Sequence, residues 1–320
     1  MITHYRDAFL EYLQKEIPRK APGNLYLPIE YILGLEGKRL RPILVLLSCD
    51  LFGEDYKKAM EAALCLEMFH NFTLIHDDIM DKADIRRGKE TVHKKWDVNT
   101  GILSGDALMI LSYKRLEHYK GEQYGSLMSL FNKVALEVCE GQQLDVDFEM
   151  ETRVSLDDYF KMISYKTAVL VGCALKMGAI IASAQKEDQQ EIYEFGLHLG
   201  IAFQLLDDYL DTFGSVDFGK RIGGDIVENK KTFLYIKTLE LANEVDSEIL
   251  MGLYSAEIDA EIKITEVKKL FQKYKVDHLL LEQIEKYTLS AFKNVERLSL
   301  EEPKKQVLID FGRSLMKRKK

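Results

Sequence analysis

The sequence predicts a fold built from long helices. Of the 320 residues, 47% are hydrophobic, which is ample for a sizeable core. Only five prolines occur, and none lies between residues 43 and 302. Because proline breaks the interior of a helix, this proline-free stretch favours long helices. At this length the chain could hold one large domain or two ordinary ones.

Apolar spacing and turn residues predict the helices in order. They are expected over 1–16, 28–34, 43–49, 55–81, 106–119, 123–149, 155–184 and 187–211, and throughout 233–316. Ser104-Gly105-Asp106 is typical of a helix start, and the segment 155–158 resembles a capping box. The apolar stretch 168–184 approaches the length of a membrane span, but Lys176 interrupts it. We therefore expect a buried core helix and no membrane span.

Charge and cysteine usage narrow the class of protein. The 44 Lys and Arg against 52 Asp and Glu give a formal net charge of −8, which argues against nucleic acid as a partner. The four cysteines stand far apart without a CxxC pair, which predicts reduced cysteines in a cytoplasmic protein. The charged first seven residues lack the apolar run of a secretory signal.

Three carboxylates close the apolar segment 74–81. On a helix Asp77 and Asp81 lie one turn apart on one face, with Asp78 beside them, so both can reach one ligand. Like charges at this spacing weaken an isolated helix by roughly 0.2–0.5 kcal/mol, which predicts a bound cation. A single DDxxD motif is better explained as a solvated acidic face.

The same motif recurs later in the chain. Asp207, Asp208 and Asp211 close another largely apolar segment that contains Gln204. Two such motifs make a solvated face a much weaker explanation. Together they indicate a divalent cation site.

Basic residues stand near both acidic motifs. They are Lys38, Arg39 and Arg41 beside Gly37, then Arg86 and Arg87, and finally Lys220, Arg221, Lys230 and Lys231 in a glycine-rich stretch. A glycine beside cations near a helix start suits a phosphate, and arginine suits bidentate contacts with phosphate. By itself the first group is equally well explained as a basic turn between helices.

Two further positions leave alternatives open. His70 lies two helical turns before Asp77, on the acidic face, where a core histidine and a ligand explain it equally well. Lys166 and Thr167 stand at the mouth of the apolar stretch 168–184. They are either a snorkelling lysine or an oxygen-binding pair, and the residues alone favour the lysine.

Carboxylates followed by cations indicate a metal-bridged polyphosphate. Magnesium fits because it is typically held by one or two carboxylates together with substrate phosphates. We expect the two motifs to face one another across a helical bundle. The sequence has no P-loop, Rossmann fingerprint or Ser/His/Asp set, so covalent catalysis and ATP hydrolysis lack support. Ionisation of a carbon–diphosphate bond is the better chemistry.

These motifs together resemble the trans-type, head-to-tail polyprenyl diphosphate synthases. In order they are GKRLRP, LIHDDIMD with RRG, GQQLD, KT, FQLLDD and GKRIGGD with NKKT. The resemblance as a whole spans about residues 25–300. The resemblance implies an all-α fold of the isoprenoid synthase type: a single domain over 1–320, forming a bundle of long helices around a deep central cavity. It also implies a homodimer, and we expect a basic tail at 317–320. Glu36 stands where many relatives carry a second glycine.

The resemblance also implies a role for each matching residue. Three magnesium ions would bind with the allylic diphosphate, held by Asp77, Asp81 and Asp207, with Asp78, Asp208 and Asp211 in support. The allylic diphosphate would contact Arg86, Lys166, Thr167, Gln204, Lys220 and Lys230. Isopentenyl diphosphate would be held without metal by Gly37, Lys38, Arg41, His70 and Arg87. The catalytic set would be Asp77, Asp81, Lys166, Asp207 and Lys220.

The implied reaction starts with ionisation of a dimethylallyl, geranyl or farnesyl diphosphate. The isopentenyl double bond then attacks the cation, and a proton is lost, in a cavity that excludes water. In this family residues before the first motif form the cavity floor. Phe72 and Thr73 lie one to two turns below the metals, with Phe69 a turn deeper. This favours geranylgeranyl diphosphate as the product, with farnesyl diphosphate as the alternative if Phe69 shortens the chain.

Proteins of other classes fit the sequence less well. A class I terpene cyclase usually lacks a second DDxxD motif, which is present here at 207–211. A head-to-head synthase would leave Lys38, Arg41 and His70 unexplained. A non-catalytic subunit of a heteromeric synthase would be expected to lose carboxylates from one motif, and both motifs are intact.

Overall fold

The computed structural model describes residues 3–214, 222–256 and 258–317 and contains two compact units. The N-terminal unit comprises Met1–Asn132 with Cys173–Gln190, and the C-terminal unit comprises Lys133–Gly172 with Glu191–Lys320. Helices α7 (Gly121–Met150), α9 (Val169–Ile181) and α10 (Lys186–Phe213) contribute residues to both. Almost all regular structure is helical, so the prediction of an all-α fold is confirmed, and the prediction of a single domain stays a prediction.

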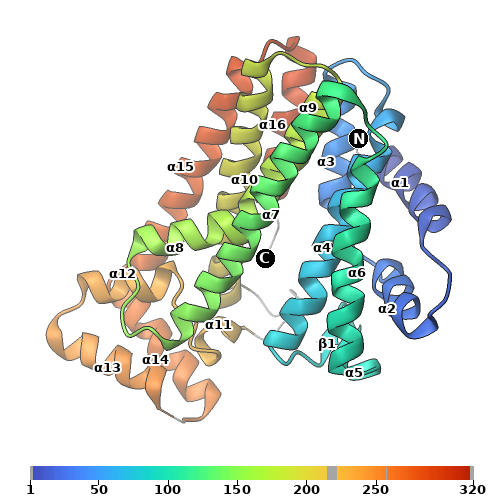
Figure 1. Cartoon of the computed structure of the whole chain (residues 1–320). Helices are drawn as coiled ribbons and strands as arrows, with labels where there is room; N and C mark the ends of the chain where they lie inside the picture. Colours follow the sequence, from blue (N-terminus) through green and yellow to red (C-terminus); the bar gives the residue numbers. More distant parts are fainter. Residues whose placement is uncertain (1–2, 215–221, 257, 318–320) are drawn as a thin grey trace. The chain divides into compact units, whose positions relative to one another are not determined.

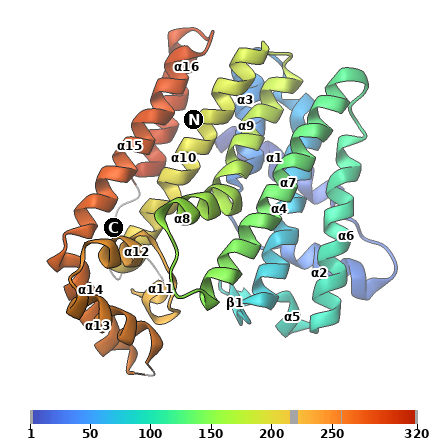
Figure 2. The same ribbon diagram turned by 60° about the vertical axis from the view of Figure 1, so that its left-hand side comes forward.

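The N-terminal unit is built around two long helices that lie side by side in both views (Figure 1, Figure 2). These are α4 (Met60–Met80) and α6 (Val98–Leu116). The remaining elements are α1 (Thr3–Glu16), α2 (Gly23–Gly34), α3 (Leu40–Leu51), the 3₁₀ turn η1 (Tyr56–Ala59), β1 (Ile85–Arg86), β2 (Lys89–Glu90) and α5 (Val92–Lys95).

Small residues of α6 allow its close approach to α4. Gly101, Ser104, Gly105 and Ser112 are all buried, and Gly101, Gly105 and Ser112 share one face of the helix at spacings of four and seven residues. A Cβ atom added at Gly105 would lie 2.3 Å from Nε2 of His76, so a larger residue there would force the imidazole of His76 to move. The expected helix start at 104–106 is therefore wrong: α6 begins at Val98, after Asp97, whose side chain accepts a hydrogen bond from the amide of Thr100.

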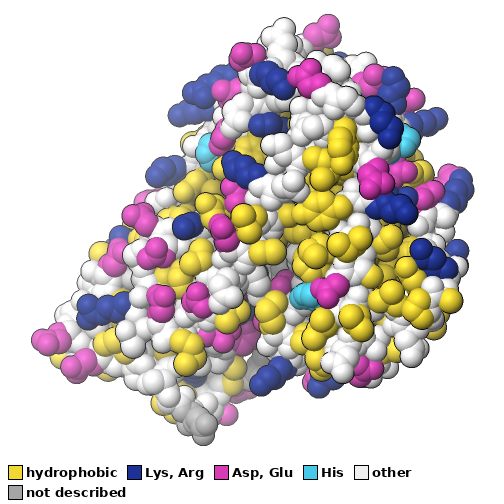
Figure 3. Space-filling view, viewed as in Figure 1, with side chains coloured by type: hydrophobic (Ala, Val, Ile, Leu, Met, Phe, Trp, Pro, Cys, Tyr) yellow, Lys and Arg dark blue, Asp and Glu magenta, His cyan; other side chains and the backbone are white. Residues whose placement is uncertain are grey.

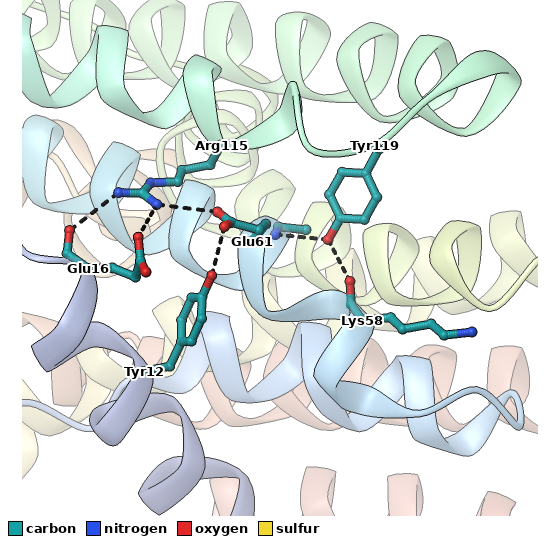
Figure 4. Close-up of polar contacts among 7 residues, drawn as sticks. Tyr12, Glu16, Lys58, Glu61, Arg115 and Tyr119 are labelled. Atoms are coloured by element: carbon teal, nitrogen blue, oxygen red, sulfur yellow. Dashed lines mark hydrogen bonds and ion pairs between the residues drawn. The ribbon is translucent and has the colours of Figure 1, made fainter.

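A polar network ties α1 to α4 and α6 (Figure 4). Arg115 of α6 donates to Glu16 of α1 over 2.6 Å and lies 3.5 Å from Glu61 of α4. The hydroxyl of Tyr12 donates to Glu61 over 2.7 Å, and that of Tyr119 donates to the carbonyl of Lys58 over 2.9 Å. The amphipathic helix predicted over 1–16 thus packs against α4 and α6 within the unit that carries the first acidic motif.

The C-terminal unit surrounds the second half of α10 with helices from the end of the chain. In both views α15 (Val276–Arg297) and α16 (Glu302–Met316) form an antiparallel pair (Figure 1, Figure 2). The other elements are α8 (Leu156–Ile163), the π-helical turn η2 (Ser164–Ala168), α11 (Gly224–Val227), α12 (Phe233–Leu241), α13 (Glu244–Ser255) and α14 (Ala260–Lys273). Tyr159, Leu205, Phe233 and Phe271 lie in its hydrophobic core.

Several other expectations can be compared with the structure. The expected helices over 1–16, 123–149 and 187–211 are confirmed within one or two residues at each end. The expected helix over 28–34 begins earlier, at Gly23, because Pro28 is accommodated inside it. Ser155 caps α8 by accepting from the amide of Asp158, as its capping box predicts. The expected basic tail lies outside the described residues apart from Lys317.

The apolar stretch before α10 is a core helix. The run Leu156–Ile181 is long and apolar enough to cross a membrane, but 72% of its most apolar window is buried inside the protein. Such burial is typical of a helix in a protein core. Cys49, Cys65 and Cys173 are buried and Cys139 is exposed, all as free thiols.

Candidate active site

The first acidic motif forms the C-terminal end of α4. Asp77 is half-buried, Asp78 is 1% exposed, and Asp81 is the exposed C-cap residue. The amide of Asp81 donates to the carbonyl of Asp77 over 2.8 Å, so the two residues stand one turn apart, as predicted. This spacing leaves two carboxylates on one edge of the helix end, where a cation can bind both.

A short hairpin returns Arg86 to this helix end. Its strands β1 and β2 pair Arg86 with Lys89, and the turn residues Arg87 and Gly88 have φ values of 53° and 72°. Two positive φ values form the tight turn that matches the twist of paired strands. The guanidinium of Arg86 then contacts both carboxylate oxygens of Asp78, with Nε 2.8 Å from each. Asp78 therefore positions Arg86 and lies away from solvent.

A second cationic group lies at the start of α3. Nη1 of Arg41 lies 3.1 Å from Nε2 of His70 on α4. Burial, and then the neighbouring Arg87, lower the pKa of Arg41 to about 10, although the carboxylate of Glu67 opposes them. Burial, and then Arg41 and Arg87, lower the pKa of His70 well below its usual value. Among the described residues, the buried Nε of Arg41 has no hydrogen-bond partner. An anion would satisfy this group.

Gly37 completes the cationic group. A Cβ atom added at Gly37 would lie 3.0 Å from the central guanidinium carbon of Arg87, so the missing side chain makes room for this arginine. Lys38 beside it is exposed. The structure thus brings Gly37, Arg41, His70 and Arg87 together, although they come from three separate segments of the sequence.

Aromatic side chains lie beneath the first acidic motif. Phe69 and Phe72 are buried, with ring centroids 5.5 Å apart, and Thr73 is half-buried. Phe69 also meets Phe131 of α7 edge-on at 5.2 Å, and Phe131 meets Tyr113 of α6 at 4.9 Å. Phe131 and Tyr113 were not predicted from the sequence, because their distant positions in the chain carry no signal of this packing.

The second acidic motif ends α10, and Asp208 lies at its centre. This carboxylate is 5% exposed and accepts from the hydroxyl of Tyr159 over 2.5 Å and from the amide of Gln204 over 2.9 Å. The oxygen of Gln204 in turn lies 3.1 Å from the hydroxyl of Thr167. Burial, and then the carboxylate of Asp225, raise the pKa of Asp208 well above its usual value. Asp208 thus orients the polar side chains around the motif.

Asp225, which follows the glycine-rich stretch, was not assigned a role from the sequence. Its amide donates to the carboxylate of Asp211 over 3.0 Å, and its own carboxylate lies 3.3 Å from Nζ of Lys230. Lys230 also pairs with Glu228 over 2.8 Å. The motif GGD therefore brings a fourth carboxylate and a cation to the second acidic cluster. Lys220 lies outside the described residues.

Lys166 stands in the π-helical turn η2, an irregularity that often marks a functional site. Its ammonium lies 2.5 Å from a carboxylate oxygen of Asp145 on α7. A Cβ atom added at Gly141 would lie 2.3 Å from the amide nitrogen of Lys166, so glycine in the GQQLD motif allows this approach. The residues Gly141 and Asp145 thus position Lys166 and are more than surface residues.

The donor set can be compared with what magnesium requires. Within the described ranges no group of three or more His, Cys, Asp or Glu side chains forms a preformed metal cage. Magnesium does not need one, because it retains waters and uses one or two carboxylates plus substrate phosphates. Asp77 with Asp81, and the Asp207–Asp211 motif, supply hard oxygen donors of this kind. The residues fit magnesium brought in with a diphosphate.

Comparisons with known proteins agree with these features. Residues 22–273 match the polyprenyl synthetase family. A geranylgeranyl pyrophosphate synthase from Geoglobus acetivorans is 35% identical over 310 residues, which cover 96% of this chain and 95% of the relative. A solved geranylgeranyl pyrophosphate synthase has 49% identity and a TM-score of 0.94, with 100% of this chain and 99% of that chain covered. A decaprenyl diphosphate synthase from Rhodobacter capsulatus has 26% identity and a TM-score of 0.91, with coverage of 100% and 97%.

An all-α fold with two acidic helix ends and nearby cations is shared with a class of prenyl-transferring enzymes. The chain belongs to the polyprenyl synthetase family and is a prenyltransferase. The resemblance seen in the sequence is thereby confirmed. The same fold also occurs in a decaprenyl diphosphate synthase, so the fold alone does not set the product length.

Proposed function

We propose that the protein condenses isopentenyl diphosphate with an allylic diphosphate to form geranylgeranyl diphosphate. The cationic group of Arg41, His70 and Arg87 carries this proposal, because its orphaned Arg41 nitrogen calls for an anion that is separate from the acidic motifs. The names of two similar proteins, both geranylgeranyl pyrophosphate synthases, support the product.

Isopentenyl diphosphate is the anion proposed for this group. The amides near Gly37 and the side chains of Lys38, Arg41 and Arg87 would bind its phosphates without a metal. His70 is uncharged, so it would orient Arg41 and add no further positive charge. Binding of the phosphates at this group would hold the double bond of isopentenyl diphosphate, the nucleophile, in a fixed place.

The allylic diphosphate is proposed to bind with magnesium. Asp77, Asp81 and Asp207 would hold the ions, three in all, with Asp78, Asp208 and Asp211 in support. When bound, magnesium stabilises the negative charge of the departing diphosphate. Arg86, Lys166, Thr167, Gln204, Lys220 and Lys230 would contact the diphosphate.

Chain residues would perform the remaining steps. Arg86 and Lys166 are each held by a carboxylate in the structure, and we propose that they exchange part of this contact for the diphosphate. The carbon–oxygen bond breaks, the isopentenyl double bond attacks the allylic carbon, and the diphosphate accepts the released proton. Neutral aromatic side chains such as Phe72 would exclude water from the cation.

The product length is proposed from the aromatic cluster. Of the two phenylalanines, Phe72 lies nearer the first motif on α4, and the small Thr73 beside it would leave room for a chain longer than a single prenyl unit. Farnesyl diphosphate is the second candidate, because Phe69 packs against both Phe72 and Phe131 and would close the floor early.

A homodimer in the cytoplasm is also proposed. Val98, Ile102, Leu103 and Ile110 of α6 are exposed, with Ile110 at 62%, and hydrophobic side chains gather over α6 (Figure 3). A second copy of the chain would cover this face. The free thiols support a reducing compartment. Replacing Ile110 by Glu should shift the mass in solution from a dimer to a monomer.

The activity is tested by release of inorganic diphosphate. Purified protein with magnesium should release diphosphate only when isopentenyl diphosphate and an allylic primer are both present. Asp207→Asn should abolish this release. Release from the allylic substrate alone, with a hydrocarbon as the product, would instead indicate a cyclase, and no release from either mixture would indicate a non-catalytic subunit.

A further inference from the structure

Arg39 belongs to the basic GKRLRP motif, but its side chain points into the protein. It is 5% exposed, and its Nη1 donates to the carboxylate of Glu67 on α4, whose side chain is equally buried. Its Nη2 donates to the carbonyl oxygens of Leu33 and Leu35, each over 2.6 Å. One guanidinium therefore connects the end of α2, the segment after it and the middle of α4.

The backbone of Arg39 is also unusual. It is the N-cap of α3 with φ 50° and ψ 38°, a left-handed conformation that disfavours residues with a side chain. The turn at Arg39 joins Lys38 to the first turn of α3, which carries Arg41. Because such a conformation persists only where its surroundings hold it, the contacts of the Arg39 side chain fix this turn.

Glu67 accepts hydrogen bonds from two residues and lies near the cationic group. Its Oε1 also accepts from the side-chain amide of Asn71 over 3.0 Å. Its charge acts on both Arg41 and Arg87, where it opposes the effect of burial. Glu67 thus anchors Arg39 and partly balances the positive charge of its neighbours.

We propose that Arg39 and Glu67 form a positioning pair for the isopentenyl diphosphate site. The pair sets the turn that fixes Lys38 relative to Arg41, and it does not itself contact the substrate. This inference rests on the proposed function and adds a residue pair that determines the affinity for one of the two substrates.

The decisive variant is Arg39→Met with Glu67→Met. It removes both charges together, keeps similar side-chain volumes and leaves neither partner as an unpaired buried charge. The carbonyls of Leu33 and Leu35 lose the Arg39 donor, so circular dichroism must show that the variant is folded before its kinetics are compared. The KM for isopentenyl diphosphate should rise at least tenfold, while the KM for the allylic primer stays within twofold. Arg39→Lys keeps the charge but offers one nitrogen to three acceptors, and it should raise the same KM at least fivefold.

Glu61→Gln is the matched control. Glu61 is also a carboxylate on α4 bound to an arginine, Arg115, but in the network that holds α1 (Figure 4). This variant should lower the melting temperature and leave both KM values unchanged.

An unchanged KM for isopentenyl diphosphate in the double variant would overturn the inference, as would a parallel rise of both KM values. If the double variant fails to fold, Arg39→Lys decides by the same comparison. Failure of the proposed function is distinguishable, because the unmodified protein would then form no condensation product when both substrates are present.

Discussion

Arg86 and Asp78 form a two-pronged contact, with Nε of the arginine 2.8 Å from each carboxylate oxygen and Nη2 2.7 Å from one of them. The aspartate is buried and the arginine is partly exposed, so the contact fixes the guanidinium plane while leaving one side of it accessible. Such a preset orientation suits bidentate binding of a phosphate group.

Arg86→Lys should weaken the allylic substrate selectively. A single ammonium cannot both hold Asp78 and present a planar pair of donors. We expect kcat/KM for the allylic diphosphate to fall at least tenfold, or about 1.4 kcal/mol. Steady-state kinetics with each substrate varied in turn measures this. Arg19→Lys, at the exposed pair with Glu30, should have no effect, and an equal loss for both substrates would contradict the assignment.

Phe72→Ala should lengthen the product. The change opens space beneath the first acidic motif, next to Phe69 and before Phe131. Chromatography of the dephosphorylated products should show species at least one isoprene unit longer. Phe9→Ala removes a buried aromatic side chain from α1 and should cost stability without changing product length. Unchanged length in Phe72→Ala would place the floor elsewhere.

Asp81→Asn should raise the magnesium concentration needed for half-maximal activity. The residue is the exposed C-cap of α4 and one of the carboxylates proposed to bind the metal. Titration of activity with magnesium at saturating substrates should show at least a fivefold shift, and EDTA should abolish activity. Glu117→Gln alters another exposed acidic C-cap, that of α6, and should leave the titration unchanged. The assignment is wrong if both variants behave alike.

His70 should make stability depend on pH. Arg41 donates to its Nε2, so this nitrogen carries no proton, and the folded pKa lies well below the usual value. Below about pH 6.5 the unfolded chain takes up a proton that the folded chain does not. Uncharged His70 therefore costs the folded protein no stability above about pH 6.5. As the pH drops below this value, the free energy of unfolding should decrease by at most about 1.4 kcal/mol per pH unit, until the pH reaches the pKa of His70 in the folded protein.

His70→Gln keeps an acceptor for Arg41 and does not titrate. The free energy of unfolding should be measured with denaturant between pH 7 and pH 5. Its slope against pH should be smaller for this variant than for the unmodified protein, by the equivalent of up to one bound proton. His278→Gln, at an exposed position, should keep the slope of the unmodified protein. The same slope in His70→Gln would mean that His70 is not the group responsible.

Sequence reasoning located the helices and the acidic motifs well because both rest on short-range spacing. Asp77 and Asp81 share a helix face because residues four apart lie one helical turn from each other. The contact between Asp78 and Arg86 could not be predicted from the sequence, because it depends on a hairpin whose turn contains a non-glycine residue, Arg87, at positive φ. The prediction of a helix start at Ser104 and Gly105 was wrong, because small residues suit helix caps and close contacts between helices equally.

Contacts between segments that are distant in the sequence could not be predicted either. Glu67 is one of several acidic residues of α4, none of which the sequence pairs with a base, and its partner Arg39 lies on another element. Asp225 belongs to a recognised motif, but its place beside Asp211 follows from the positive φ of Gly223. The prediction that the two acidic motifs face one another stays a prediction.

The central claim is tested most directly by the mass of the product. The purified protein should be incubated with magnesium, isopentenyl diphosphate and, separately, dimethylallyl, geranyl or farnesyl diphosphate, and the products analysed by mass spectrometry. We predict a discrete C20 diphosphate from each primer. A C15 end product from dimethylallyl and geranyl diphosphates, with no elongation of farnesyl diphosphate, would identify a farnesyl diphosphate synthase. The absence of elongation from every primer by folded protein would contradict the account.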